Sequence, residues 1–149
     1  MAIRKILTGN DPVLTTKCRE ITEFNARLHD FLDDMAQTME KADGVGLAAN
    51  QVGVLRRACI IDVDGLIELI NPEIIATDGE QFEQEGCLSF PGDFGTTHRP
   101  LTVEVRAVDR FGKPFTLKAT DLKARAICHE IDHLNGITFK SRTTNGADL

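Results

Sequence analysis

Apolar residues recur at helical spacing between residues 25 and 43, which predicts an amphipathic helix. These residues fall on one face of a helix with a 3.6-residue period: Leu28, Phe31, Leu32, Met35 and Met39. Asn25 suits the N-cap because its side chain can accept from a free backbone N–H of the first turn. Gly44 suits the end of the helix, and it opens a stretch of small residues, GVGLAANQVG at 44–53.

The middle of the chain has the β-branched and alternating patterns that are typical of strands. Four segments are predicted as strands: 56–64, 66–79, 102–109 and 114–119. Asp64 and Gly65 form a turn after the first, and Asn71-Pro72 indicates a break within the second. The last two segments are separated by a short turn, so we expect them to pair as a hairpin.

A second helix is predicted from about Thr120 to Gly136, with the glycine just past its end. Ile127, Ile131 and Leu134 form an apolar stripe that would face the core. We therefore expect an α+β fold in which antiparallel or mixed strands pack around this C-terminal helix. A single domain would cover residues 1–149, with a polar and frayed tail from about residue 140.

Composition narrows the range of partners. The chain is 42% hydrophobic and 27% charged, as in ordinary globular proteins. Its net charge of −6 argues against nucleic acid or an anionic membrane as the main partner, because phosphate groups attract a basic face. No run approaches the roughly 20 apolar residues of a membrane span, and the N-terminus lacks the apolar core of a secretory signal. We expect a cytoplasmic protein with free cysteines.

The motif HEIDH at 129–133 carries the clearest chemistry in the chain. Histidines four residues apart lie on one helix face, so both rings can bind one cation, and Glu130 lies about 100° round from His129 and can border the same site. The alternative is a polar helix face with incidental histidines. Asp132 faces elsewhere and is expected to pair with an arginine such as Arg106. A catalytic metal site needs a third protein ligand and an open position.

Cys87 is the best candidate for that third ligand. It lies in EGCLS at 85–89, where Gly86 permits close approach of the backbone, although a buried core cysteine is the alternative interpretation. The three other cysteines are weaker candidates. Cys18 lies in a polar loop, Cys59 lies in an apolar strand, and Cys128 points about 100° away from His129 on the helix. His29 and His98 have unspecific surroundings.

Three motifs in a fixed order resemble those of the peptide deformylases, metal hydrolases that remove the formyl group from the N-terminal formylmethionine of nascent chains. GVGLAANQ at 44–51 resembles the family's GxGLAAxQ, and EGCLS at 85–89 its EGCLS. HEIDHLNG at 129–136 resembles its HExxH followed by Leu and Gly. The resemblance extends from LTGNDPVL near the N-terminus to about Gly136. It implies one catalytic domain that acts on formyl-Met nascent peptides.

The resemblance also implies a role for each matching residue. The implied metal ligands are Cys87, His129 and His133. Glu130 matches the general acid/base, while Gln51 and the backbone N–H of Leu88 match the two donors that stabilise the oxyanion. The implied native metal is Fe(II), and Zn, Ni or Co can occupy the same site.

A further group of residues is expected to border the substrate. Val45 and Gly46 match the segment that binds the peptide backbone as an added strand, and the residues before Cys87 are expected to lie beside it: Glu85 and Gly86. The methionine side chain needs an apolar pocket. We expect its wall and mouth on one face of the last helix, at Leu122, Ala126, His129 and Arg125.

Two other functions fit part of the pattern. An HExxH zinc peptidase would need a third His or Glu ligand downstream, and the residues after His133 contain neither. The second alternative function is that of a non-catalytic protein that binds formylated peptides. Against it, the side chains needed for catalysis are all present. Asn50 and Cys128 depart from the usual family residues without touching the implied ligand set. The short segment after Gly136 argues against ribosome docking through a C-terminal helix.

Overall fold

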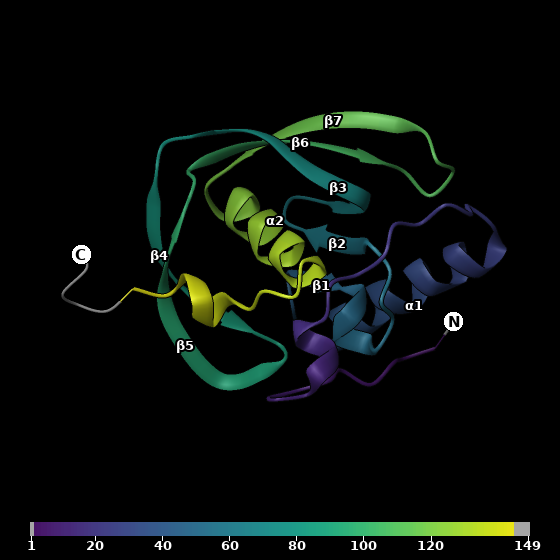
Figure 1. Cartoon of the computed structure of the whole chain (residues 1–149), viewed down its shortest axis with the longest axis horizontal. Helices are drawn as coiled ribbons and strands as arrows, with labels where there is room; N and C mark the ends of the chain where they lie inside the picture. The colour runs from purple at the N-terminus through teal and green to yellow at the C-terminus, as the bar shows by residue number, and fades with distance from the viewer. Residues whose placement is uncertain (1, 145–149) are drawn as a thin grey trace.

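The helix α2 lies in the middle of the molecule, with strands of a sheet and of a separate hairpin around it (Figure 1). This computed structural model describes residues 2–144. The antiparallel sheet has the order β1-β2-β3-β6-β7, with these bounds: β1 Gly46–Ala48, β2 Ala58–Asp62, β3 Leu66–Asp78, β6 Thr102–Val108 and β7 Pro114–Thr120. The hairpin pairs β4 (Gln81–Cys87) with β5 (Phe90–Arg99).

Two α-helices and three 3-10 turns complete the described part of the chain: α1 Ala26–Lys41, α2 Asp121–Leu134, η1 Pro12–Thr15, η2 Ala49–Val52 and η3 Phe139–Arg142. The predicted α+β class is confirmed, and the named strand pairs are all antiparallel. Among the described residues, no helix has the length and apolar character that crossing a membrane requires.

The strand β2 separates two apolar clusters and is buried on both faces. Ala58 and Ile60 belong to the cluster that contains the apolar face of α1. Cys59 and Ile61 belong to the cluster that contains the apolar stripe of α2. Successive side chains of a strand point to opposite faces, so burial on both faces requires the unbroken apolar run seen here. Because β2 lies between the two clusters, both helices pack against the same sheet.

The first helix forms as the sequence predicts. Asn25 caps α1, and its Oδ1 accepts from the backbone N–H of Leu28 at 3.1 Å. The helix ends at Lys41, slightly earlier than expected, and the N–H of Gly44 donates to the carbonyl of Met39 at 3.0 Å. This bond closes the helix and directs the chain into β1.

The second helix is buried on more than its apolar stripe. The predicted stripe lies in the core, but every residue from Ala126 to Leu134 is also buried, including both histidines of the motif. Gly136 follows in the left-handed region, at φ +76°, and a Cβ there would lie 2.7 Å from the carbonyl oxygen of Thr15. The helix therefore presents its polar residues to the interior, where only paired or liganded groups are stable.

The predicted break at Asn71 and Pro72 is instead a bulge within the continuous strand β3. The pairing register with β6 shifts between Ile70 and Glu73. Asn71 has φ +52°, and its side chain accepts from the N–H of Ile21 and donates to the carbonyl of the same residue, each at 2.8 Å. The bulge thus attaches the N-terminal segment to the sheet.

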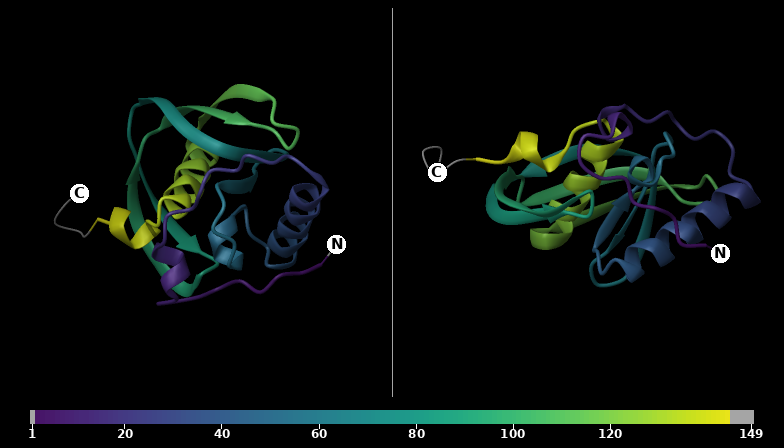
Figure 2. Two further views of the ribbon diagram at one scale, coloured as in Figure 1. Left: turned by 45° about the vertical axis from the view of Figure 1, so that its right-hand side comes forward. Right: turned by 90° about the horizontal axis from the view of Figure 1, so that it is seen from below.

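Three features of the structure go beyond what the sequence pattern indicated. The sequence pattern did not predict the β4–β5 hairpin, because β5 contains two glycines and half of its residues are exposed. Cys18 lies in the loop between η1 and α1, as expected, but its side chain packs in the core with only 2% of its surface exposed. Of the tail predicted to be frayed from about residue 140, the described part is ordered, because η3 packs beside the hairpin and Thr143 bridges to Thr97 (Figure 2). Residues 145–149 of that tail lie outside the described residues.

Candidate metal centre

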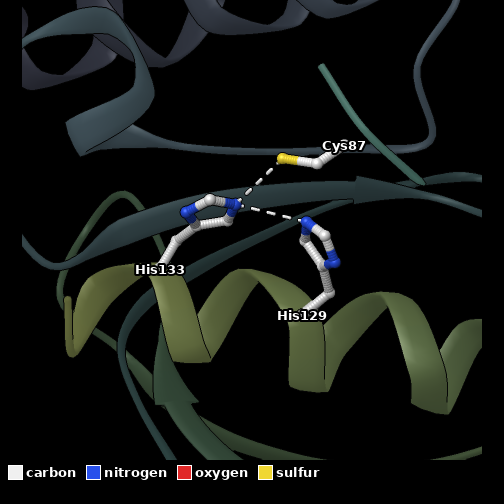
Figure 3. Close-up of side chains that lie close together, drawn as sticks. All are labelled: Cys87, His129 and His133. Atoms are coloured by element: carbon white, nitrogen blue, oxygen red, sulfur yellow. Dashed lines mark hydrogen bonds between the residues drawn. The ribbon is translucent and has the colours of Figure 1, made fainter. Parts of the chain in front are cut away.

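Three side chains from two distant segments converge beside α2 (Figure 3). The Nε2 atoms of His129 and His133 are 3.2 Å apart, and the Cys87 Sγ is 3.3 Å from the Nε2 of His133. All three donor atoms lie within 4.8 Å of one another. Ligands bound at about 2.0–2.3 Å in a tetrahedral arrangement are separated by roughly 3.3–3.6 Å, so the spacing fits a single metal ion.

Local structure explains how Cys87 reaches the histidines. It is the last residue of β4, just after a register shift between Gly86 and Cys87. The ring of Phe94 lies against Gly86, where a Cβ would come within 2.8 Å of a ring carbon. The sequence indicated that Gly86 allows a close approach, and the structure identifies Phe94 as the group that approaches it.

The electrostatics of the two histidines favour a single positive charge between them. Burial alone would lower the pKa of His129, but the charge of Glu130 and the hydrogen bonds with Cys87 and Glu85 outweigh it and raise the pKa to about 10. Burial and the adjacent His129 hold the pKa of His133 well below its usual value. A cation bound between two uncharged rings would likewise place one positive charge beside these acidic neighbours.

Glu130 borders this cluster without belonging to it. Its Oε2 lies 4.0 Å from the Nε2 of His129, and its Oε1 is buried with no hydrogen-bond partner among the described residues. Complete burial raises the pKa of Glu130 to about 7, although the neighbouring His129 opposes the shift. Gly46 of β1 leaves room for this carboxylate, because a Cβ there would lie 2.5 Å from Oε2. The carboxyl group is thus free to exchange a proton beside the three donor atoms.

Gln51 is oriented by the turn that carries it. Its Oε1 accepts from the N–H of Ala48 at 2.9 Å, which turns its amide nitrogen toward the donor cluster. That Nε2 donates to the Ser89 hydroxyl at 3.1 Å and lies 3.6 Å from the Cys87 Sγ. Sequence reasoning missed Ser89 as a partner, although it lies within the EGCLS motif.

Asn50, which departs from the usual family residue, supports the histidine helix. It is fully buried in η2, and its Nδ2 donates to the backbone carbonyl of His133 at 2.6 Å. The glycine-rich motif and the HExxH helix are therefore joined directly. Cys128 is buried in the core on another face of the helix, as its position predicts, and is not part of the donor cluster.

Glu85 binds protein groups through both of its carboxylate oxygens. Its Oε1 accepts from the Nδ1 of His129 at 2.5 Å and from Arg99 at 2.8 Å. Burial would raise the pKa of Glu85, but the hydrogen bonds from His129 and Arg99 lower it to about 2. The carboxylate thus orients the ring of His129, and because Glu85 also lines the cavity, its contact with substrate stays a prediction.

The expected partner of Asp132 is wrong. Asp132 pairs with Arg99 at 2.6 Å and with Arg142 at 3.0 Å, whereas Arg106 pairs with Glu73 on the exposed face of the sheet. Sequence reasoning could not select these arginines because they lie on β5 and η3, two elements that the pattern did not predict. Two arginines on one buried aspartate indicate an extended ionic network behind the histidines.

A cavity of about 510 Å³ opens beside the donor cluster. All of the residues predicted to border the substrate line it: Val45, Gly46, Glu85, Gly86, Leu122, Arg125 and Ala126. So do Gln51, Cys87, Leu88, His129 and Glu130. Sequence reasoning missed Phe90 and Phe94, which add aromatic surface to the lining. The surface of the cavity is thus largely apolar, as is typical of a small-molecule site.

The sequence model of the polypeptide deformylase family matches residues 3–147. The chain belongs to this family. A peptide deformylase of Alkaliphilus metalliredigens is 55% identical over 143 residues, covering 95% of this chain and 97% of that protein. A second peptide deformylase, from Caldanaerobacter subterraneus subsp. tengcongensis, is 54% identical over 149 residues. The match covers 99% of this chain and 94% of that protein.

Solved structures of deformylases have the same fold. The enzyme from Thermotoga maritima superposes with a TM-score of 0.94 at 35% identity, covering 96% of this chain and 99% of that one. The enzyme from Synechococcus elongatus, crystallised in complex with actinonin, gives a TM-score of 0.93 at 40% identity and covers 97% and 81%. Family membership makes this deformylase a metal-dependent hydrolase, and it argues against the two alternative functions considered from the sequence.

Proposed function

We propose that this deformylase hydrolyses the formyl group from the N-terminal formylmethionine of nascent peptides in the cytoplasm, releasing formate. The observation that carries the assignment of residues is the convergence of Cys87, His129 and His133 beside the buried Glu130 and the oriented amide of Gln51. These groups come from three separate motifs, and each has a distinct chemical use in amide hydrolysis.

One thiolate and two imidazoles would hold one divalent metal. When bound, the metal supplies Lewis-acid activation of water and of the formyl oxygen. We propose Fe(II) as the native metal, with Zn, Ni or Co able to occupy the same mixed sulfur and nitrogen site. Three protein ligands would leave a further coordination position for water, as catalytic sites require.

The proposed proton carrier is Glu130. Its unpartnered Oε1 is free to take a proton from the attacking water and then deliver it to the leaving amine nitrogen. Gln51 Nε2 and the backbone N–H of Leu88 would donate to the oxygen that becomes negative as the formyl carbon is attacked. Removal of one such donor typically costs on the order of 10²–10³ in rate.

The substrate peptide would bind along the free edge of β1. This strand is the first in the order β1-β2-β3-β6-β7, so Val45 and Gly46 lie at an edge that can pair with an extended peptide. The methionine side chain would enter the apolar cavity beside Leu122 and Ala126, with Arg125 at its mouth. The open cavity leaves room for the rest of a nascent chain.

The first experiment measures formate release from formyl-Met-Ala-Ser by protein purified without oxygen, with the metal content of the same sample determined. We expect rapid release with about one metal per chain. The variant Glu130→Ala should keep its metal and lose turnover, whereas Glu73→Ala, which removes an exposed surface ion pair, should keep both. A fully metallated wild type that released no formate would refute the assignment.

A further inference from the structure

A chain of alternating charges leads from the back of one histidine to the C-terminal segment. His129 Nδ1 donates to Glu85 Oε1 at 2.5 Å, and Arg99 Nη2 donates to the same oxygen at 2.8 Å. Arg99 Nη1 then donates to Asp132 Oδ2 at 2.6 Å. Arg142 completes the series, with its Nε and Nη2 donating to the two oxygens of Asp132 at 3.0 and 3.1 Å.

Burial makes Arg142 the only member of this series that solvent reaches freely. The side chains of Glu85, Arg99 and Asp132 are 8%, 3% and 12% exposed, whereas that of Arg142 is 44% exposed. Without Arg142, two buried carboxylates would share the single guanidinium of Arg99. An uncompensated buried charge is costly, so the remaining groups would have to shift or admit water.

The same segment touches the histidine in a second way. Phe139 of η3 is buried and stacks on the His129 ring, with 6.1 Å between ring centroids and 22° between ring planes. Thr143 bridges to Thr97, whose hydroxyl donates to Glu85 Oε2 at 2.6 Å. Figure 2 shows the yellow η3 turn lying against the hairpin that carries these groups. Ring packing and charge pairing from one short segment therefore meet at one imidazole.

We infer that Arg142 is a positioning residue for His129, acting through Asp132, Arg99 and Glu85. This inference rests on the proposed function only in taking His129 as a metal ligand. With Nδ1 donating to Glu85, the Nε2 lone pair is directed toward Cys87 and His133. The carboxylate that accepts from the ring fixes its tautomer and orientation and strengthens its donation to a cation. Arg142 keeps that carboxylate in place by neutralising the next acid in the series.

The test replaces Arg142 with methionine, which keeps the length of the side chain but removes its charge and donors. The metal-free variant is titrated with Co(II) in competition with a chelating dye, and the absorption spectrum of the Co(II) form is recorded. We expect the dissociation constant to rise about 3- to 10-fold, less than the 10- to 100-fold typical of a residue that contacts a ligand directly. The Co(II) absorption bands should shift as the ligand geometry relaxes.

A matched control is Arg106→Met, because Arg106 also pairs with a carboxylate but lies exposed on the sheet. It should leave the Co(II) affinity and spectrum unchanged. Wild-type affinity and spectrum in Arg142→Met, or the same change in both variants, would overturn the inference. If Arg142→Met does not fold, Arg142→Gln replaces it, and wild-type behaviour there would overturn the inference equally.

Both readouts are independent of substrate. A protein that binds Co(II) tightly, shows the Arg142 effect and releases no formate would refute the proposed function and leave the inference standing. If the wild type hydrolyses formyl-Met-Ala-Ser and Arg142→Met binds Co(II) as the wild type does, the proposed function stands and the inference is refuted.

Discussion

Gly46 lies where the absence of a side chain matters most in this molecule. Its α-carbon faces the buried carboxylate of Glu130, and a Cβ would lie 2.5 Å from Oε2 and 3.0 Å from Cγ. The carboxylate has little space into which it can retreat, because Glu130 is only 4% exposed. The glycine therefore determines where the proposed proton carrier lies relative to the donor atoms.

The variant Gly46→Ala should lose activity with little loss of metal. Displacement of Glu130 by a few tenths of an ångström or more should reduce kcat about 10- to 100-fold, since misplacement of about 1 Å can cost roughly 10² in rate. Formate release and metal content are measured on the same preparation. A variant with full metal content and wild-type kcat would show that the contact is not restrictive.

Leu122 is the residue that best tests the proposed methionine pocket. It lines the cavity and is 42% exposed, so a larger side chain can be introduced without disturbing the core. Leu122→Trp should lower kcat/KM for formyl-Met-Ala-Ser about tenfold or more, because the added ring occupies space meant for the substrate. Leu66→Trp, at a comparably exposed leucine on β3, is the control and should have no effect. Normal use of the substrate by Leu122→Trp would place the pocket elsewhere.

At the scale of elements, the β3 bulge joins segments that are far apart in the sequence. Asn71 adopts φ +52°, which asparagine tolerates better than most residues, and binds both the N–H and the carbonyl of Ile21. The interruption visible in the sequence is therefore a point of attachment within the strand. It anchors the segment that leads from η1 to α1.

Substitution at Asn71 should reduce stability without altering the metal site. Asn71→Ala removes two hydrogen bonds, each worth about 0.5–1.5 kcal/mol, so the free energy of unfolding should fall by about 1–3 kcal/mol. Asn71→Asp keeps the acceptor for the Ile21 N–H and loses only the donor, so its loss should be smaller. Urea unfolding of the metal-free proteins gives both values. Equal losses in the two variants would contradict this account of the bulge.

At the scale of the whole molecule, the metal centre lies where the hairpin, α2 and η2 meet. Cys87 comes from the end of the β4–β5 hairpin and the histidines from α2. Gln51 approaches from η2 on a third side. A bound metal would therefore stabilise the folded arrangement, because its ligands are assembled only when these elements are in place.

Removal of the metal should lower the thermal midpoint. A ligand present at about 100 times its dissociation constant adds roughly 2.7 kcal/mol, which corresponds to about 5–10 °C for a chain of this length. Thermal unfolding is compared with and without 1,10-phenanthroline. Cys87→Ala, which loses one donor, should show a much smaller chelator effect. An unchanged midpoint in the wild type would show that the site contributes nothing to stability.

The proposed iron form should be the least durable in air. Oxygen can oxidise both Fe(II) and the Cys87 sulfur, since Cys87 lines the cavity and is only partly buried. Deformylase activity of the Fe(II), Ni(II) and Zn(II) forms is followed over time in air, and the iron form should decay first. Equal half-lives for all three metals would contradict this expectation.

Much of the fold follows from local patterns in the sequence. The cap at Asn25 and the apolar spacing of the two helices describe interactions between residues close in the chain, and these elements form as predicted. The hairpin of β6 and β7 is likewise visible from alternation and a short turn. The β4–β5 hairpin was missed because its glycines and exposed residues weaken that alternation, although it carries Cys87.

By itself, the sequence determined the chemistry that is available: a pair of histidines with an adjacent glutamate on one helix, a cysteine beside a glycine, and a glutamine at the end of a small-residue motif. Only the tertiary structure decided which groups surround them. The partners of Asp132 are 33 and 10 residues away in the chain, and the contact from Asn50 to His133 spans 83 residues. Helical and strand periodicities report on near neighbours, so such pairings exist only once the sheet, hairpin and helix have packed together.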